Sequence, residues 1–192
     1  MKTIPVGIED FKEIKDRECY YVDKSMLIKD VLQEKVVLYT RPRRFGKTLN
    51  MSMLNYFYNI KEKENAYLFE GLSIYKEKEV MKHQNRYPVI FLSLKDMKRQ
   101  TFEMQVEKFC SLIAFVMEEY YELLNSNYLS HTEKILMEKY ITKTSTISDL
   151  EDSLMNISIC LEKHYGEKVV ILIDEYDVPL QHAYIQGYMM RW

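Results

Sequence analysis

The chain is poor in the features that mark secreted, membrane-spanning and disulfide-rich proteins. Its 192 residues contain three cysteines, Cys19, Cys110 and Cys160, an odd and widely spaced set that argues against a disulfide framework and against zinc. No run of about 18 apolar residues occurs, which argues against a membrane-spanning helix. The first residues reach acidic side chains too early for a signal peptide, so we expect a cytoplasmic protein.

The chain also lacks a strong net charge, internal repeats and low-complexity segments. The formal net charge is −2, so no global basic field points to nucleic acid or to an anionic membrane. No linker rich in proline, glycine or serine divides the sequence. With 47% hydrophobic and 29% charged residues, the composition is typical of a globular protein with one proper core.

A short motif, Gly46-Lys47-Thr48, lies between two apolar patterns. The run Val36–Tyr39 predicts a β-strand before the motif, and Leu49, Met53 and Phe57 predict a helix after it. A strand, a turn and a helix in this order form a phosphate cradle, because the turn exposes backbone N–H groups and the helix N-terminus adds partial positive charge. An ordinary helix start is the alternative interpretation of so short a motif.

The motif matches the general phosphate-loop pattern G-x-x-x-x-G-K-[ST] except at its first glycine, which is Arg41 here. Gly46 would let the backbone approach a phosphate closely. Lys47 would reach the β and γ phosphates, and the Thr48 hydroxyl would take one coordination position of Mg²⁺. Four cations in seven residues also fit a polyanionic ligand, although a solvated basic turn is the alternative. They are Arg41, Arg43, Arg44 and Lys47.

A second signal lies far downstream, where an apolar run ends in acidic residues. The β-branched run Val169–Ile173 predicts a strand that is buried on both faces, as in a parallel sheet. Ligands of open α/β sheets bind beyond the carboxyl ends of the strands. Asp174 would therefore hold Mg²⁺, and Glu175 would polarise an attacking water as a general base. A solvated strand end with a helix cap is the alternative.

The order of the expected elements predicts an α/β fold. Pro88 opens another expected strand, Val89–Leu92, and helical patterns separate it from the strand at 169–173. Strands that alternate with helices imply a parallel sheet with right-handed crossovers. The tail, Val178–Trp192, predicts a helix or loop and no further strand.

Four segments occur in an order that resembles a known family. They are Val6–Phe11, Tyr20–Ser25, Thr40–Leu49 and Ile173–Asp177. Together they are similar to the AAA-ATPase-like domain of many bacterial and some archaeal proteins, whose phosphate loop reads R-P-R-R-F-G-K-[ST]. The arginine at the first loop position is expected for that family.

The resemblance implies a P-loop NTPase fold of the additional-strand, catalytic-glutamate type, with a parallel sheet sandwiched by helices. It implies Lys47 and Thr48 as the Walker A pair, and Asp174 and Glu175 as the Walker B pair. Relatives often carry a C-terminal PD-(D/E)XK nuclease domain. The residues implied at the nucleotide are Arg41, Arg43, Arg44, Phe45, Gly46, Lys47, Thr48 and Leu49.

The same resemblance suggests how the chain is divided. We expect an N-terminal adapter over residues 1–35 and a P-loop ATPase-like domain over residues 36–192. In this fold class a fourth strand inserts between the first and the third. No candidate for the fourth or fifth strand follows Asp177, so we expect the domain to be incomplete at its C-terminus.

The resulting functional hypothesis is ATP binding with Mg²⁺ and hydrolysis, with Lys47 and Glu175 as catalytic residues. One alternative is a catalytically weak nucleotide-binding or interaction module of a larger, nuclease-linked protein. A second is a P-loop kinase, against which Glu175 argues. The expected partner is a nucleoside triphosphate, with a link to DNA only through a missing nuclease domain and none to a membrane. Oligomeric state stays open.

Overall fold

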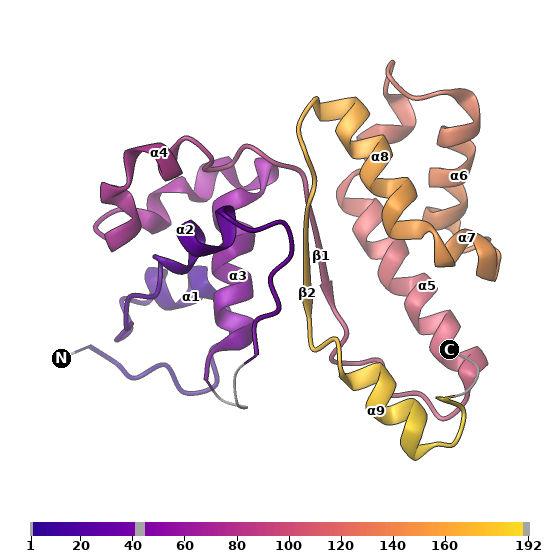
Figure 1. The fold of residues 1–192 in the computed structure, drawn as a ribbon, viewed down its shortest axis with the longest axis horizontal. Helices are drawn as coiled ribbons and strands as arrows, with labels where there is room; N and C mark the ends of the chain where they lie inside the picture. The colour runs from indigo at the N-terminus through magenta and orange to yellow at the C-terminus, as the bar shows by residue number, and fades with distance from the viewer. Residues whose placement is uncertain (1, 41–44, 190–192) are drawn as a thin grey trace. The chain divides into compact units, whose positions relative to one another are not determined.

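The computed structural model describes residues 2–40 and 45–189 (Figure 1). The chain forms two compact units, Met1–Val89 and Ile90–Trp192, and each is described by itself. Among the described residues, no helix combines the length and the apolar character needed to cross a membrane. All three cysteines are buried free thiols.

Unit 1 is helical and is built around α3 (Lys47–Tyr58), the helix that begins at the predicted phosphate loop. The N-terminal segment packs against this helix, since the Phe11 N–H donates to the Ser52 hydroxyl of α3 at 3.0 Å. The Phe11 ring is fully buried and lies 5.4 Å from that of Phe69. Phe57 of α3 contacts the same ring at 5.1 Å. The other elements are α1 (Phe11–Asp16), α2 (Leu27–Leu32), η1 (Ile60–Phe69), η2 (Ser73–Lys76) and α4 (Lys78–Met81).

Unit 2 contains a two-stranded sheet of β1 (Val89–Ser93) and β2 (Val170–Asp174), with β1 beginning at the unit boundary. Figure 1 shows α5, α6 and α8 bundled beside the strands, and their apolar faces form one core with Ile90 and Leu92 of β1. The helices and turns are α5 (Phe102–Glu119), η3 (Tyr121–Asn125), α6 (His131–Thr142), α7 (Ile147–Glu151), α8 (Ser153–Tyr165) and α9 (Val178–Ile185).

The two strands end at the same edge of the sheet. The backbone N–H of Leu94, just after β1, donates to the carbonyl of Asp174 at the end of β2, with an N–O distance of 2.9 Å. This arrangement follows from a parallel pair joined by helices. A mixed α/β protein with a small parallel sheet and many helices is therefore confirmed. The predicted boundary between an adapter over 1–35 and an ATPase-like domain over 36–192 stays a prediction.

The prediction of a β-strand at Val36–Tyr39 is wrong. These residues lie in no strand of the described structure, and the side chains of Val36 and Leu38 are 88% and 68% exposed. An apolar run becomes a strand only when a neighbouring strand accepts its backbone hydrogen bonds. In the described residues, β1 and β2 pair only with each other, so this segment has no ladder partner.

The prediction that the strand before Asp174 is buried on both faces is also wrong. Leu172 and Asp174 are buried, whereas Ile171 and Ile173 are 42% and 37% exposed. Successive side chains of a strand point to opposite faces, so one face of β2, with Leu172 and Asp174, is buried and the other, with Ile171 and Ile173, is partly open. The expected sandwich of helices on both faces of the sheet stays a prediction.

Candidate functional site

The predicted phosphate loop leads into α3 through a glycine whose backbone needs the left-handed conformation. Gly46 has φ = +74°, which a residue with a Cβ atom rarely adopts, and α3 begins at Lys47. No side chain caps the first N–H groups of α3, and its first turn has no acidic residue. These N–H groups can therefore bind an anion. The other loop residues of interest, Arg41, Arg43 and Arg44, lie outside the described residues.

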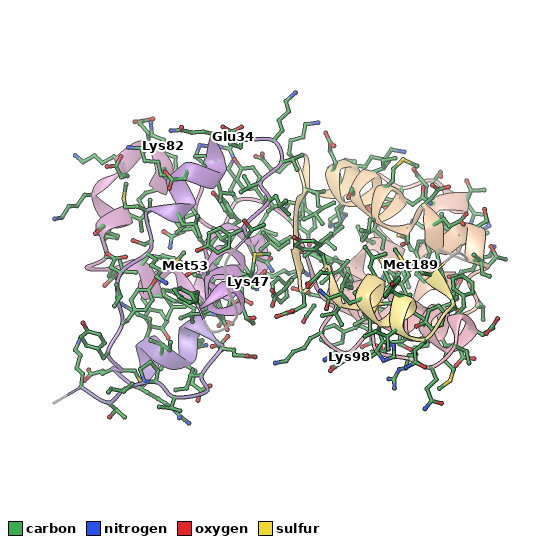
Figure 2. All side chains as sticks on the ribbon, turned by 60° about the horizontal axis from the view of Figure 1, so that its bottom comes forward. Glu34, Lys47, Met53, Lys82, Lys98 and Met189 are labelled. Carbon is green, nitrogen blue, oxygen red and sulfur yellow. The ribbon has the colours of Figure 1, made fainter. Side chains whose placement is uncertain are left out.

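The remaining predicted nucleotide-binding residues surround this helix start. Lys47, Thr48 and Leu49 are half-buried in the first turn of α3, and Phe45 before it is exposed. Figure 2 labels Lys47 at this helix. Within unit 1, the structure thus brings together the described members of the predicted set in one turn of backbone.

Sequence reasoning missed a second lysine at the loop. The ammonium group of Lys24 donates a hydrogen bond to the carbonyl of Phe45 at 3.4 Å, and it lies 3.9 Å from the position of a Cβ atom at Gly46. Lys24 forms no ion pair with a carboxylate among the described residues. It lies in the segment Tyr20–Ser25, which carried part of the family resemblance, but its 23-residue separation from Lys47 gives no local signal of this contact.

Asp23, the residue before Lys24, forms hydrogen bonds away from the loop. The carboxylate of Asp23 accepts hydrogen bonds from the backbone N–H groups of Ser25, at 2.8 Å, and Ser73, at 2.7 Å. Burial raises the pKa of Asp23, but the hydrogen bonds from these two serines outweigh it and lower the pKa to about 2. Asp23 therefore joins the segment before α2 to η2. It does not pair with the Lys24 ammonium group, which bonds to the loop instead.

A second carboxylate fixes α3 from the N-terminal segment. Asp10 caps α1 by accepting from the Glu13 N–H at 2.8 Å, and it accepts from the hydroxyls of Ser52 and Tyr56 on α3, both at 3.1 Å. Burial, followed by the charge of Asp10, raises the pKa of Tyr56, so the tyrosine stays a donor. The helix that presents Lys47 is thus held by residues of the predicted adapter.

In unit 2, a buried carboxylate at the end of β2 has a described hydrogen-bond partner on only one of its two oxygen atoms. Asp174 is 4% exposed. Its Oδ1 atom accepts from the Glu175 N–H at 3.0 Å, and its Oδ2 atom is buried with no hydrogen-bond partner among the described residues. A buried carboxylate oxygen without a partner is costly, and a bound cation would remove that cost.

Glu175, the predicted general base, has an unusual backbone. Its φ of +55° lies in the left-handed region, which costs a non-glycine residue on the order of 1 kcal/mol. The residue is half-buried and its carbonyl accepts from the N–H of Val178 at 3.1 Å, in the turn that opens α9. Strain of this kind is concentrated at functional sites, so the observation favours a role for Glu175.

Neither predicted motif, taken by itself, supplies enough protein ligands in its described part to hold a metal ion. Among the described residues, no three His, Cys, Asp or Glu side chains gather into a metal cluster. Mg²⁺ keeps several waters and needs only one or two protein oxygens when phosphates supply the rest. The Asp174 carboxylate in unit 2 and the Thr48 hydroxyl in unit 1 are each an oxygen donor of the required type.

Comparison with known families decides the relationship of this chain. A family model described as a predicted AAA-ATPase, of the AAA-ATPase-like family, matches residues 5–191. The chain belongs to the AAA-ATPase-like family. The match covers both units, including the Gly46-Lys47-Thr48 and Asp174-Glu175 motifs.

The AAA-ATPase-like chain is also similar to one curated protein. An uncharacterized protein in the vnfD 5′ region of Azotobacter chroococcum mcd 1 is 26% identical over 186 residues, which cover 93% of this chain. The match covers 30% of that relative, so the chain spans less than a third of its length. No solved structure matches the chain.

Proposed function

We propose that this chain binds ATP with Mg²⁺ and hydrolyses the bond between the β and γ phosphates. The observation that carries the proposal is the orphaned Oδ2 atom of Asp174, a buried acceptor at the end of a strand in a family of predicted ATPases. The uncapped start of α3, with Lys47 and Lys24 beside it, supplies the groups that bind phosphate.

The proposed mechanism assigns one task to each residue. The N–H groups at the start of α3 and the Lys47 ammonium bind the β and γ phosphates and neutralise charge that develops on them. Thr48 and Asp174 would hold Mg²⁺, which supplies further charge neutralisation when bound. Glu175 orients a water molecule and accepts its proton. The hydrogen bond from the Glu175 N–H to Asp174 couples the base to the metal ligand.

The first experiment compares Mg-ATP binding by the wild-type chain and by Lys47→Ala, using a fluorescent ATP analogue. We expect the substitution to weaken binding at least tenfold, because it removes the phosphate-binding ammonium group. The control is Lys63→Ala, which removes an exposed lysine of η1 in the same unit. Equal affinity of the wild type and Lys47→Ala for Mg-ATP contradicts the phosphate cradle.

A nucleotide-binding module with little turnover is the second candidate. The segment Val36–Tyr39, which leads into the loop, lies outside the sheet. A loop that no strand anchors can bind phosphates through its N–H groups, but it positions them less accurately for catalysis. Intact Mg-ATP binding with no release of phosphate over hours favours this candidate over the ATPase.

A further inference from the structure

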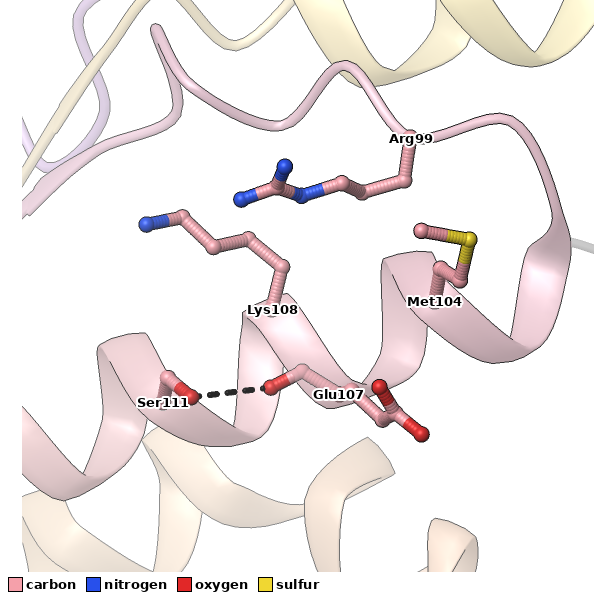
Figure 3. Close-up of a pocket in the computed structure, with 5 residues that line it drawn as sticks. All are labelled: Arg99, Met104, Glu107, Lys108 and Ser111. Carbon is pink, nitrogen blue, oxygen red and sulfur yellow. Dashed lines mark hydrogen bonds between the residues drawn. The ribbon is translucent and has the colours of Figure 1, made fainter.

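A pocket of about 220 Å³ lies in unit 2 between the loop after β1 and the start of α5. Figure 3 shows the guanidinium group of Arg99 and the ammonium group of Lys108 side by side in it, extending in the same direction. Arg99 comes from the loop and Lys108 from the helix, so chain folding brings the two charges together. The lining residues are Arg99, Met104, Glu107, Lys108 and Ser111.

The two cations of this pocket have no acidic partner among the described residues. Both are half-buried, whereas the ion pairs of unit 2 engage other lysines, such as Lys163 with Glu133. The carboxylate of Glu107 points away from the two cations in Figure 3, and its backbone carbonyl accepts the Ser111 hydroxyl at 3.1 Å. Two neighbouring positive charges repel each other, and an anion bound between them removes this repulsion.

The loop that carries Arg99 is held by a buried amide. Gln105 is 0% exposed, and its Oε1 atom accepts from the Arg99 N–H at 3.1 Å while its Nε2 atom donates to the Met97 carbonyl at 2.9 Å. The Tyr188 hydroxyl donates to the Arg99 carbonyl at 2.7 Å. Both backbone polar groups of Arg99 are therefore fixed, which reduces the ordering cost of binding a ligand there.

The shape of the two groups indicates which anion fits. The planar guanidinium of Arg99 can donate two parallel hydrogen bonds to an oxyanion, and the Lys108 ammonium adds a point charge beside it. The loop follows the strand end where Leu94 bonds to Asp174, which is the edge of α/β sheets that binds ligands. We propose that the pocket formed by Arg99 and Lys108 binds a phosphate group of a nucleotide or of a nucleic-acid backbone.

The test measures binding of a fluorescein-labelled single-stranded DNA 12-mer and of a fluorescent ATP analogue to the full chain. Arg99→Gln with Lys108→Gln should weaken binding of at least one probe tenfold or more. The matched control is Lys98→Gln, an exposed lysine of the same loop that does not line the pocket, and it should change affinity less than twofold. If the DNA is the ligand, the double variant should also lower the slope of log affinity against log salt by about 1.4, since each phosphate contact contributes about 0.7.

The two probes separate the sources of the phosphate. Loss of DNA binding with unchanged ATP binding identifies a nucleic-acid site, and the reverse identifies a nucleotide site. Lys47→Ala should leave DNA binding unchanged, so this proposal can fail or succeed apart from the ATP site. The proposal is overturned if the wild type binds neither probe at low salt, or if the double variant, with an unchanged melting temperature, binds both like the wild type. It is also overturned if polyglutamate displaces the bound probe as well as inorganic phosphate does, because the site then recognises carboxylates.

Discussion

The predicted motifs of the two units have opposite charge. In unit 1, the start of α3 combines uncapped N–H groups with Lys24 and Lys47, and it has no acidic residue in its first turn. In unit 2, the end of β2 combines a buried carboxylate oxygen that lacks a partner with a second carboxylate on a strained backbone. The start of α3, with Lys24 and Lys47, is called the cationic half and favours an anion as ligand. The end of β2, with Asp174 and Glu175, is called the anionic half and favours a cation. The proposed Mg-ATP ligand contains groups of both kinds.

The two halves are also supported differently. Side-chain carboxylates of the N-terminal segment, Asp10 and Asp23, fix the cationic half. Backbone pairing of β1 with β2 fixes the anionic half, through the bond from Leu94 to Asp174. Single substitutions of the supporting residues should therefore lower the stability of the cationic half. Substitutions in the anionic half should mainly change the hydrolysis rate and metal binding.

The largest expected effect is on turnover, through the anionic half. Glu175→Gln should lower the hydrolysis rate at least 100-fold, because the amide cannot accept the proton of water. Binding of Mg-ATP should change less than threefold. Phosphate release and nucleotide binding are measured on the same samples, with the exposed neighbour variant Tyr176→Phe as the control. Turnover that survives in Glu175→Gln means that another group activates water.

The next largest effect should fall on the stability of the cationic half. Asp10→Ala removes the cap of α1 and the acceptor of Ser52 and Tyr56, so we expect the free energy of unfolding to fall by about 2 kcal/mol. Chemical denaturation of the variant provides the measurement. Asp16→Ala, at the end of the same helix, removes one hydrogen bond from Tyr67 and serves as the milder control. A loss no greater than that of the control shows that Asp10 does not anchor α3.

Removal of the orphaned carboxylate should separate metal binding from nucleotide binding. Asp174→Asn should weaken Mg²⁺ binding to the ATP complex about tenfold, while binding of ATP without metal stays unchanged. The melting temperature of the nucleotide-free variant should rise, because a buried charged oxygen without a partner no longer opposes folding. Titration with Mg²⁺ and thermal unfolding test the two halves of this prediction. A lower melting temperature with unchanged Mg²⁺ affinity assigns Asp174 to structure alone.

The smallest effect should come from the lysine that the sequence did not reveal. Lys24→Met should weaken Mg-ATP binding about fivefold, which corresponds to about 1 kcal/mol for one partly solvated contact with phosphate. Lys24→Arg should retain most of the affinity, and Lys63→Met provides the control. Measured affinities that are equal for Lys24→Met and the control limit the role of Lys24 to its bond with Phe45.

Local signals were sufficient for the helix after the loop and for the strands at 89–93 and 170–174. Each combines a strong apolar pattern with a terminator such as Gly166, the left-handed C-cap of α8. The same kind of signal failed at Val36–Tyr39, because a strand depends on a partner that no local pattern encodes.

The candidate site was predictable only in part, for a similar reason. Lys47, Thr48, Asp174 and Glu175 lie in short motifs whose chemistry can be recognised from residue types and spacing. The contact of Lys24 with Phe45 joins residues 21 positions apart, and the amide of Gln105 acts on a loop through a buried hydrogen bond. Contacts of this kind appear only when the backbone is in place.

The burial of Cys19, Cys110 and Cys160 gives the chain a surface without reactive thiols among its described residues. A cysteine introduced at an exposed position in each unit, for example at Lys63 and Glu138, would therefore be the preferred target of maleimide dyes. Energy transfer between two such dyes would report whether added nucleotide changes the separation of the units, in an otherwise native background.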